Sequence, residues 1–317
     1  YFLIYSAQAV DVGSVFIANV VANAFYVLFF VKAFLSWRPA FDRNLSPTIF
    51  QYGYPIMLTG LAGMTNEMFS RIALDKWLPE NFYPGKTTSY AVGVFGAAYK
   101  LAVLMGLGTM AFRYAAEPFF FSHASEKNSP QLFARVNHYF IIVGCIVLLG
   151  VSINLDIIKY FLAQPEYWDA LHVVPVLLLA YLVTGVYYNF SVWFKLTDKT
   201  YYGTIITIGG AVITILANYI LIPMAGYEGS SWAALLCTLV MTITCYVLGQ
   251  RFYPIPYRIL KGMTYVALSM LIIYGVYSID TFITNQYVAT TFHASVILAF
   301  IVVSFIIERN ELRQVRA

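Results

Sequence analysis

Long apolar stretches separated by short polar connections fill this chain. Residues 1–10 are expected to be the outer end of an earlier stretch. Each of nine later stretches is about as long as a membrane helix, which needs roughly 20 apolar residues: 13–35, 48–75, 90–121, 131–153, 169–194, 201–223, 229–250, 258–279 and 287–308. Because the connections are short, helices that are neighbours in sequence must pack together. The pattern predicts an all-α polytopic membrane protein with about nine transmembrane helices.

The basic residues fall in every second connection. Three of them, Lys76, Lys86 and Lys159, lie in one set of connections. Thirteen lie in the alternate set: Lys32, Arg38, Arg43, Lys127, Arg135, Lys195, Lys199, Arg251, Arg258, Lys261, Arg309, Arg313 and Arg316. Cytoplasmic loops of multispanning proteins carry excess Lys and Arg, so we expect the second set and the C-terminus to be cytoplasmic. The longest external pieces are then 76–89 and 154–168, of which the second reads as a short interfacial helix.

Composition agrees with a membrane protein. The chain is 60% hydrophobic and 11% charged, whereas a soluble domain has about 45–50% apolar and about 25% charged residues. The basic balance comes from the cytoplasmic loops and requires no nucleic-acid partner. The chain begins at Tyr1 without Met, and we expect it to be the later part of a longer protein.

Charged residues inside the apolar stretches are the first candidates for function. Glu67 and Arg71 are four residues apart, a spacing that suits an ion pair on one helix face. Lys100 enters the next, antiparallel stretch at a comparable depth. Ionisable groups in a span are costly and usually face a cavity or a partner. The two cations either line a site for an anionic substrate, or snorkel to the headgroups and neutralise Glu67.

Further candidates lie deeper in the chain. Arg113 and Glu117 repeat the four-residue spacing near the cytoplasmic end of their span. Tyr187 and Asn189 could contact sugars in a hydrated cavity, or could join helices through hydrogen bonds. The Gly106-Leu-Gly108 pattern lies inside an apolar span, where small residues allow close helix approach, so it does not indicate dinucleotide binding.

No enzyme signature is present. The four histidines show no metal-ligand spacing, and Cys145, Cys237 and Cys245 lie singly within apolar stretches. We therefore expect a protein that is not an enzyme and that carries neither a cofactor nor a metal ion.

Three stretches carry a family resemblance: QYGYPIMLTGLAGMTNEMFSRIALDKWLP at 51–79, YAVGVFGAAYKLAVLMGLGTMAFRYAAEPFFFSHASEKNSP at 90–130 and NYILIPMAGYEGSSWAALL at 218–236. They resemble the seventh span, the eighth span with its basic loop, and the turn between the eleventh and twelfth spans of polysaccharide flippases. These belong to the multidrug/oligosaccharidyl-lipid/polysaccharide (MOP) superfamily, Wzx-type repeat-unit exporters among them. The third stretch is the most specific. Where relatives often have Gly-Ala-Ala, this chain has Gly229, Ser230 and Ser231, which are also small.

The resemblance aligns the chain with the later spans of a fourteen-span protein. It implies three parts: 1–47 as the end of a first lobe with the inter-lobe loop, 48–250 as a MATE-like six-helix lobe, and 251–317 as two extra transmembrane helices with a cytoplasmic tail. Two such lobes enclose a cavity of alternating access.

The function that the resemblance implies is export of a polyprenyl-diphosphate-linked oligosaccharide across the bacterial inner membrane, for assembly of surface polysaccharide such as lipopolysaccharide. The expected partners are this lipid-linked glycan, membrane lipid and other glycan-assembly proteins. Arg71 and Lys100 are expected to hold the diphosphate, because Arg binds phosphate oxygens bidentately and Lys acts as a point charge. Arg113 would guard the cytoplasmic mouth, Tyr187 and Asn189 would contact sugar, and Glu67 would carry a coupling proton or hold Arg71.

Two alternatives remain open. A drug or cation antiporter of the same superfamily would need an acidic cavity, whereas the ionisable residues within the spans lean cationic. A membrane scaffold of a glycan-assembly complex, without transport activity, would account for a single lobe.

Overall fold

All regular structure that the computed structural model describes is helical. It describes residues 12–36, 43, 45–162, 164–283 and 285–314. The α-helices are α2 (Val12–Ser36), α3 (Ser46–Trp77), α4 (Thr88–Ser122), α5 (Ser129–Ser152), α6 (Leu155–Ile158), α7 (Val174–Phe190), α8 (Val192–Leu196), α9 (Tyr201–Phe252), α10 (Ile259–Asp280) and α11 (Gln286–Gln314). Two 3₁₀ segments, η1 (Lys159–Phe161) and η2 (Pro165–Val173), lie between α6 and α7.

Within these residues seven helices are long and apolar enough to cross a membrane. One of them, α9, has 52 residues and contains two predicted spans, which meet at Gly226, where the backbone φ of +56° interrupts the helix. The predicted span 48–75 forms α3, which is not among the seven; its last third carries four charged residues, Glu67, Arg71, Asp75 and Lys76. The predicted fold class, an all-α polytopic membrane protein, is confirmed.

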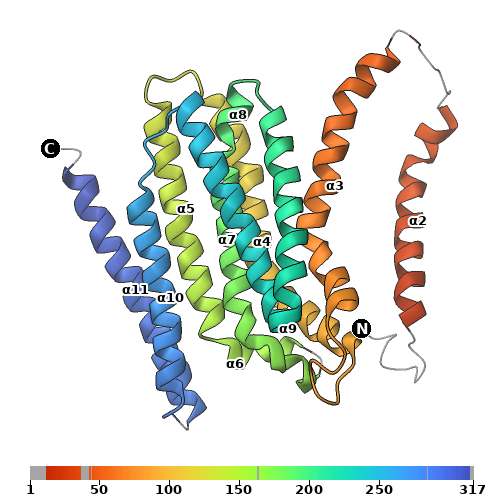
Figure 1. The fold of residues 1–317 in the computed structure, drawn as a ribbon. Helices are drawn as coiled ribbons and strands as arrows, with labels where there is room; N and C mark the ends of the chain where they lie inside the picture. Colours follow the sequence, from red (N-terminus) through yellow and green to blue (C-terminus); the bar gives the residue numbers. More distant parts are fainter. Residues whose placement is uncertain (1–11, 37–42, 44, 163, 284, 315–317) are drawn as a thin grey trace. The chain divides into compact units, whose positions relative to one another are not determined.

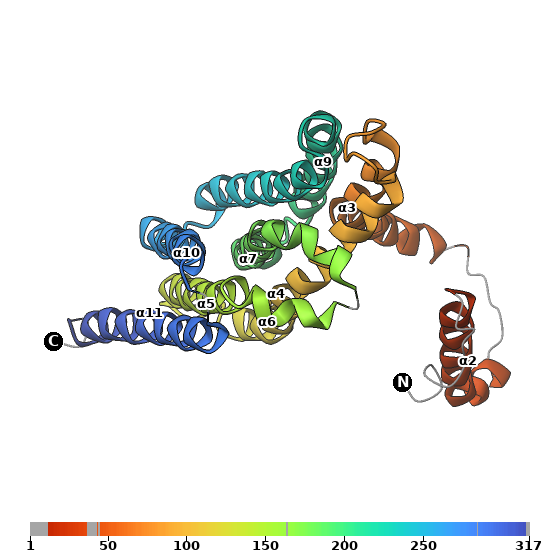
Figure 2. The same ribbon diagram turned by 90° about the horizontal axis from the view of Figure 1, so that it is seen from below.

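The chain divides into two compact units, Tyr1–Gly53 and Tyr54–Ala317. In the second unit α7 is the central helix and packs against α4, α5 and α9, while α10 and α11 pack against α5. Figure 2 shows α7 enclosed by these neighbours. The core between α4, α5 and α7 consists of large apolar side chains such as Phe95, Leu148 and Leu177. The second unit includes α10 and α11 as well as α4 to α9. This division does not test the predicted boundary at residue 250, which stays a prediction.

The loops of the second unit gather at its two ends. The α4–α5, α8–α9 and α9–α10 connections lie at one end, and the α3–α4, α5–α7 and α10–α11 connections at the other (Figure 1). The connections predicted to be cytoplasmic therefore share one end of this unit. The predicted interfacial segment 154–168 contains α6, η1 and the start of η2, and the rings of its residues Tyr160 and Trp168 have centroids 5.6 Å apart.

From Tyr54 onward, α3 packs along the first half of α9. Thr59 Oγ1 donates a hydrogen bond to Thr204 Oγ1 at 2.8 Å, and the rings of Trp77 and Tyr219 meet edge to face at 5.5 Å. These contacts set the position of the α3 residues Glu67 and Arg71.

Candidate functional site

A row of tyrosine and charged side chains lies between α4 and α7. On α4, Tyr99, Gly106 and Arg113 follow one another at intervals of seven residues, and on α7 Tyr181 and Tyr188 do the same. Seven residues are close to two helical turns, so each set lies on one face of its helix. The Tyr99 and Tyr181 rings meet at 5.8 Å, and the Arg113 guanidinium lies 4.5 Å from the centre of the Tyr188 ring.

Together with neighbouring side chains of α3 and α8, we call this row the charged seam. Its outer end, named after the predicted orientation, consists of Glu67, Arg71, Tyr99 and Tyr181, and its inner end of Arg113, Glu117, Tyr188 and Lys195. From Tyr99 to Glu117 the seam follows α4 for 18 residues, or about 27 Å at 1.5 Å per residue. The hydrocarbon core of a bilayer is about 30 Å thick. The seam therefore extends over most of the depth of a membrane.

Glycine makes room for the outer end of the seam. A Cβ atom at Gly106 would lie 2.9 Å from Cε1 of Tyr181. Gly106 therefore allows close packing, and the side chain that packs against it is Tyr181. The Tyr181 hydroxyl in turn donates a hydrogen bond to Oε1 of Glu67 at 3.4 Å.

Arg71 is placed differently from the sequence prediction. Among the described residues no ion pair joins it to Glu67, so the expected four-residue pair is not formed. Instead the Arg71 guanidinium lies 4.8 Å from the centre of the Tyr99 ring, and its buried Nε has no hydrogen-bond partner within the described part of the chain. Burying a donor without an acceptor costs about 1–3 kcal/mol of stability. A ligand oxygen that accepts a hydrogen bond from this Nε would remove that cost.

Lys100 follows Tyr99 directly and is therefore turned by about 100° around α4. Its side chain is exposed and forms no ion pair with any described acidic residue. The structure thus brings Arg71 against the residue next to Lys100. That the two cations bind one ligand stays a prediction.

At the inner end one carboxylate serves two cations. Oε1 of Glu117 lies 2.9 Å from Nε of Arg113 and 2.5 Å from Nζ of Lys195. The four-residue pairing of Arg113 with Glu117 is confirmed. Lys195, which lies on α8, was not a predicted site residue, because no local spacing connects it to α4.

Tyr187 and Asn189 are buried between α7 and its neighbours rather than placed in the seam. Asn189 donates from Nδ2 to the backbone carbonyl of Gly185 at 3.0 Å, and the backbone carbonyl of Asn189 accepts from the Tyr257 hydroxyl at 3.3 Å. Both residues therefore take part in helix packing. Contact with sugar stays a prediction for them.

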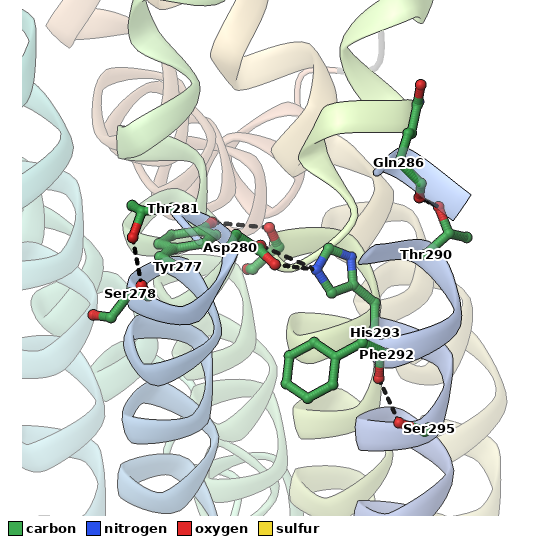
Figure 3. A network of polar contacts seen from close by, with 10 residues as sticks. Tyr277, Ser278, Asp280, Thr281, Gln286, Thr290, Phe292, His293 and Ser295 are labelled. Atoms are coloured by element: carbon green, nitrogen blue, oxygen red, sulfur yellow. Dashed lines mark hydrogen bonds and ion pairs between the residues drawn. The ribbon is translucent and has the colours of Figure 1, made fainter. Parts of the chain in front are cut away.

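Sequence reasoning missed a buried cluster around Glu308. Its Oε1 lies 3.0 Å from Nε2 of His138, 2.8 Å from Nζ of Lys261 and 3.0 Å from the hydroxyl of Tyr265. The cluster joins α5, α10 and α11. At the other end of α10 and α11, Nε2 of His293 lies 3.0 Å from both carboxylate oxygens of Asp280 (Figure 3).

The Glu308 cluster holds the α10–α11 hairpin on α5, helped by the Tyr277 hydroxyl, which donates to the carbonyl of Ser152 at 2.8 Å. The His293–Asp280 contact joins α10 to α11. The partners are up to 170 residues apart, so no sequence spacing could have indicated them. Among the described residues no group of three or more His, Cys, Asp or Glu side chains is arranged to hold a metal ion.

The fold and the seam define a multi-pass α-helical membrane protein with ionisable side chains from α3, α4, α7 and α8 grouped near two positions along α4. No protein-family model, curated protein or solved structure matches the chain.

Proposed function

We propose that this chain is part of a flippase that exports a polyprenyl-diphosphate-linked oligosaccharide across the bacterial inner membrane for surface polysaccharide assembly. The protein must shield a sugar and a diphosphate from hydrocarbon while the polyprenyl tail stays in lipid. The proposal rests on the family resemblance together with the chemistry of the outer end of the seam.

The observation that carries the proposal is that Arg71 and Lys100 lack acidic partners among the described residues. Two carboxylates lie four residues from Arg71 in sequence: Glu67 receives the Tyr181 hydroxyl, and Asp75 lies 3.3 Å from Nζ of Lys76. Ionisable residues in a span cost at least about 2.5–3.5 kcal/mol each unless they are paired or hydrated. Two cations on neighbouring helices without carboxylates favour an anionic ligand over a cationic drug.

Arg and Lys suit a diphosphate in different ways. The planar guanidinium binds two phosphate oxygens at once, and the ammonium supplies a compact point charge. The unpartnered Nε of Arg71 offers one of the donors that such a contact requires. Glu67 then has the role of positioning Tyr181, or of carrying a coupling proton.

The proposal predicts that Arg71→Ala or Lys100→Ala abolishes surface glycan while the protein remains folded in the membrane. Arg71→Lys should retain part of the activity, because the bidentate contact is lost, and Lys100→Arg should be milder. Surface polysaccharide is measured at matched expression. Lys76→Ala is the control. Lys76 lies on α3, as Arg71 does, but its side chain is exposed and paired with Asp75.

The double variant Glu67→Gln/Arg71→Gln separates substrate binding from mutual neutralisation. If the two charges only compensated each other, removing both would cost little. Wild-type surface glycan in the double variant would refute the role of Arg71 in binding substrate.

A further inference from the structure

We propose that the inner end of the seam is a second diphosphate-binding site, formed by Arg113 and Lys195, in which Glu117 acts as an internal competitor. The carboxylate occupies the two cations when no ligand is bound, and the diphosphate displaces it. This inference rests on the proposed function and adds to it a cytoplasmic stage of substrate binding, a new binding residue, and a means of release.

The geometry supports a site rather than a simple ion pair. One oxygen of Glu117 receives both Nε of Arg113 and Nζ of Lys195. Arg113 thereby gives Glu117 one of the five N–H groups of a guanidinium, and Lys195 gives one of its three. The guanidinium carbon lies over the Tyr188 ring, 4.5 Å from its centre, and this contact restricts the movement of the side chain. Several donors therefore remain in a fixed arrangement around a single carboxylate oxygen.

The charges are unbalanced in favour of an anion. Two cations and one carboxylate leave one positive charge. A diphosphate, with more than one negative charge and several acceptor oxygens, satisfies both cations better than a single carboxylate can. The three side chains are 21–37% exposed, so a ligand can reach them without unfolding the helices.

The same contacts connect two helices. Arg113 and Glu117 belong to α4, whereas Lys195 belongs to α8, and the Lys195–Glu117 contact joins them. A diphosphate that takes over the two cations removes this direct bridge and leaves Glu117 free. Ligand binding and the α4–α8 contact are therefore linked, as binding must be in a transporter that changes its access.

The experiment measures binding of inorganic pyrophosphate to the purified full chain by isothermal calorimetry. Glu117→Gln should lower the Kd about three- to fivefold, because the ligand no longer has to displace a charged carboxylate from a partly exposed pair. Arg113→Gln and Lys195→Gln should each raise the Kd about tenfold or more, because each removes charge-assisted hydrogen bonds to the ligand.

Thermal unfolding supplies a second measurement. Without ligand, Glu117→Gln should lower the Tm, because two neighbouring cations lose their counter-charge. Pyrophosphate should raise the Tm of this variant more than that of the wild type, because a ligand stabilises the state that binds it more tightly. A carboxylate with only a structural role would lower the Tm with no such gain from pyrophosphate.

Glu126→Gln is the matched control. It removes the same charge from the following loop, where Glu126 is exposed and lies 3.9 Å from His123. An equal gain in affinity from Glu126→Gln would reduce the effect to net charge and overturn the proposal. An unchanged or weaker affinity in Glu117→Gln would also overturn it, as would a wild-type chain that does not bind pyrophosphate.

Bulk lipid headgroups carry similar phosphate chemistry, so binding is compared in phosphatidylcholine and phosphatidylglycerol nanodiscs. Equal pyrophosphate affinity in both supports a diphosphate site, whereas loss of binding in phosphatidylglycerol would assign the site to lipid headgroups and overturn the proposal. The two proposals fail separately. Normal surface glycan in the Arg71 variants would refute the flippase site alone, and pyrophosphate binding that is insensitive to Glu117 would refute the inner site alone.

Discussion

Single buried polar residues in this protein form hydrogen bonds to helices that are far away in sequence. Asn218 on α9 donates from Nδ2 to Oγ of Ser70 on α3 at 3.1 Å, and its Oδ1 accepts from Oγ of Ser230 at 3.0 Å. It thus joins α3 to α9 and also joins the two halves of α9. Its side chain is completely buried. The stretch 218–236, which carries the most specific resemblance, therefore contains a residue with a clear structural task.

Replacing Asn218 with Ala should destabilise the protein by about 1–3 kcal/mol, because two interhelical hydrogen bonds are lost and their serine partners stay buried. The free energy of unfolding is measured by titration with a denaturing detergent. Asn154→Ala is the control. Asn154 and Asn218 both donate from Nδ2 to the backbone carbonyl four residues earlier, at 2.8 Å, but Asn154 is bonded to no other helix among the described residues. Equal losses in both variants would contradict the proposed role.

At the scale of elements, the interruption of α9 depends on a single glycine. Gly226 has φ +56°, and a Cβ there would collide with the hydroxyl of Tyr83. That hydroxyl accepts a hydrogen bond from the backbone N–H of Tyr227 at 3.2 Å, and the two rings stack at 5.0 Å. Burial raises the pKa of the Tyr83 phenol, so it remains neutral in this contact. The α3–α4 loop thus holds the bend in α9.

Gly226→Ala should destabilise the protein by about 1–3 kcal/mol, because an L-residue is strained at this φ and the Tyr83 contact must open. Gly209→Ala on the same helix is the control. Nothing lies within 4 Å of a Cβ at Gly209, so alanine should be neutral, or stabilising by up to about 1 kcal/mol. Thermal unfolding of both variants decides; a neutral Gly226→Ala would refute this explanation of the bend.

At the scale of the whole molecule, the charge pattern and the arrangement of the helices agree. The connections rich in Lys and Arg share one end of the unit Tyr54–Ala317 (Figure 1). The charge rule predicts which end faces the cytoplasm. The structure supplies the independent fact that these connections lie together, and the two facts together make the topology testable with single substitutions.

We predict that cysteines introduced by Lys127→Cys and Thr200→Cys are protected from a membrane-impermeant maleimide in intact cells, whereas Lys86→Cys is labelled. All three positions are exposed. The native Cys145, Cys237 and Cys245 are buried, so the unsubstituted chain serves as the blank. Labelling at position 127 or 200 from outside would overturn the span assignment.

The sequence alone determined the helical class, the bounds of most helices, and the pairing of Arg113 with Glu117. Two bounds differ: the predicted span 169–194 is divided among η2, α7 and α8, and α11 continues beyond residue 308 to Gln314. These properties are local: apolar length sets a span, and a separation of four residues sets a pair on one helix face. The bend between the two halves of α9 was also foreseeable, as two spans separated by a short Gly-containing turn.

Only the tertiary structure decided which side chains meet across helices. It placed Arg71 on Tyr99 instead of Glu67, Lys195 on Glu117, and Glu308 on His138. The physical reason is that membrane helices are apolar on their lipid-facing and their packed faces alike, so hydrophobic periodicity does not reveal how a helix is rotated. Rotation follows from close packing, and with it the partner of each buried charge.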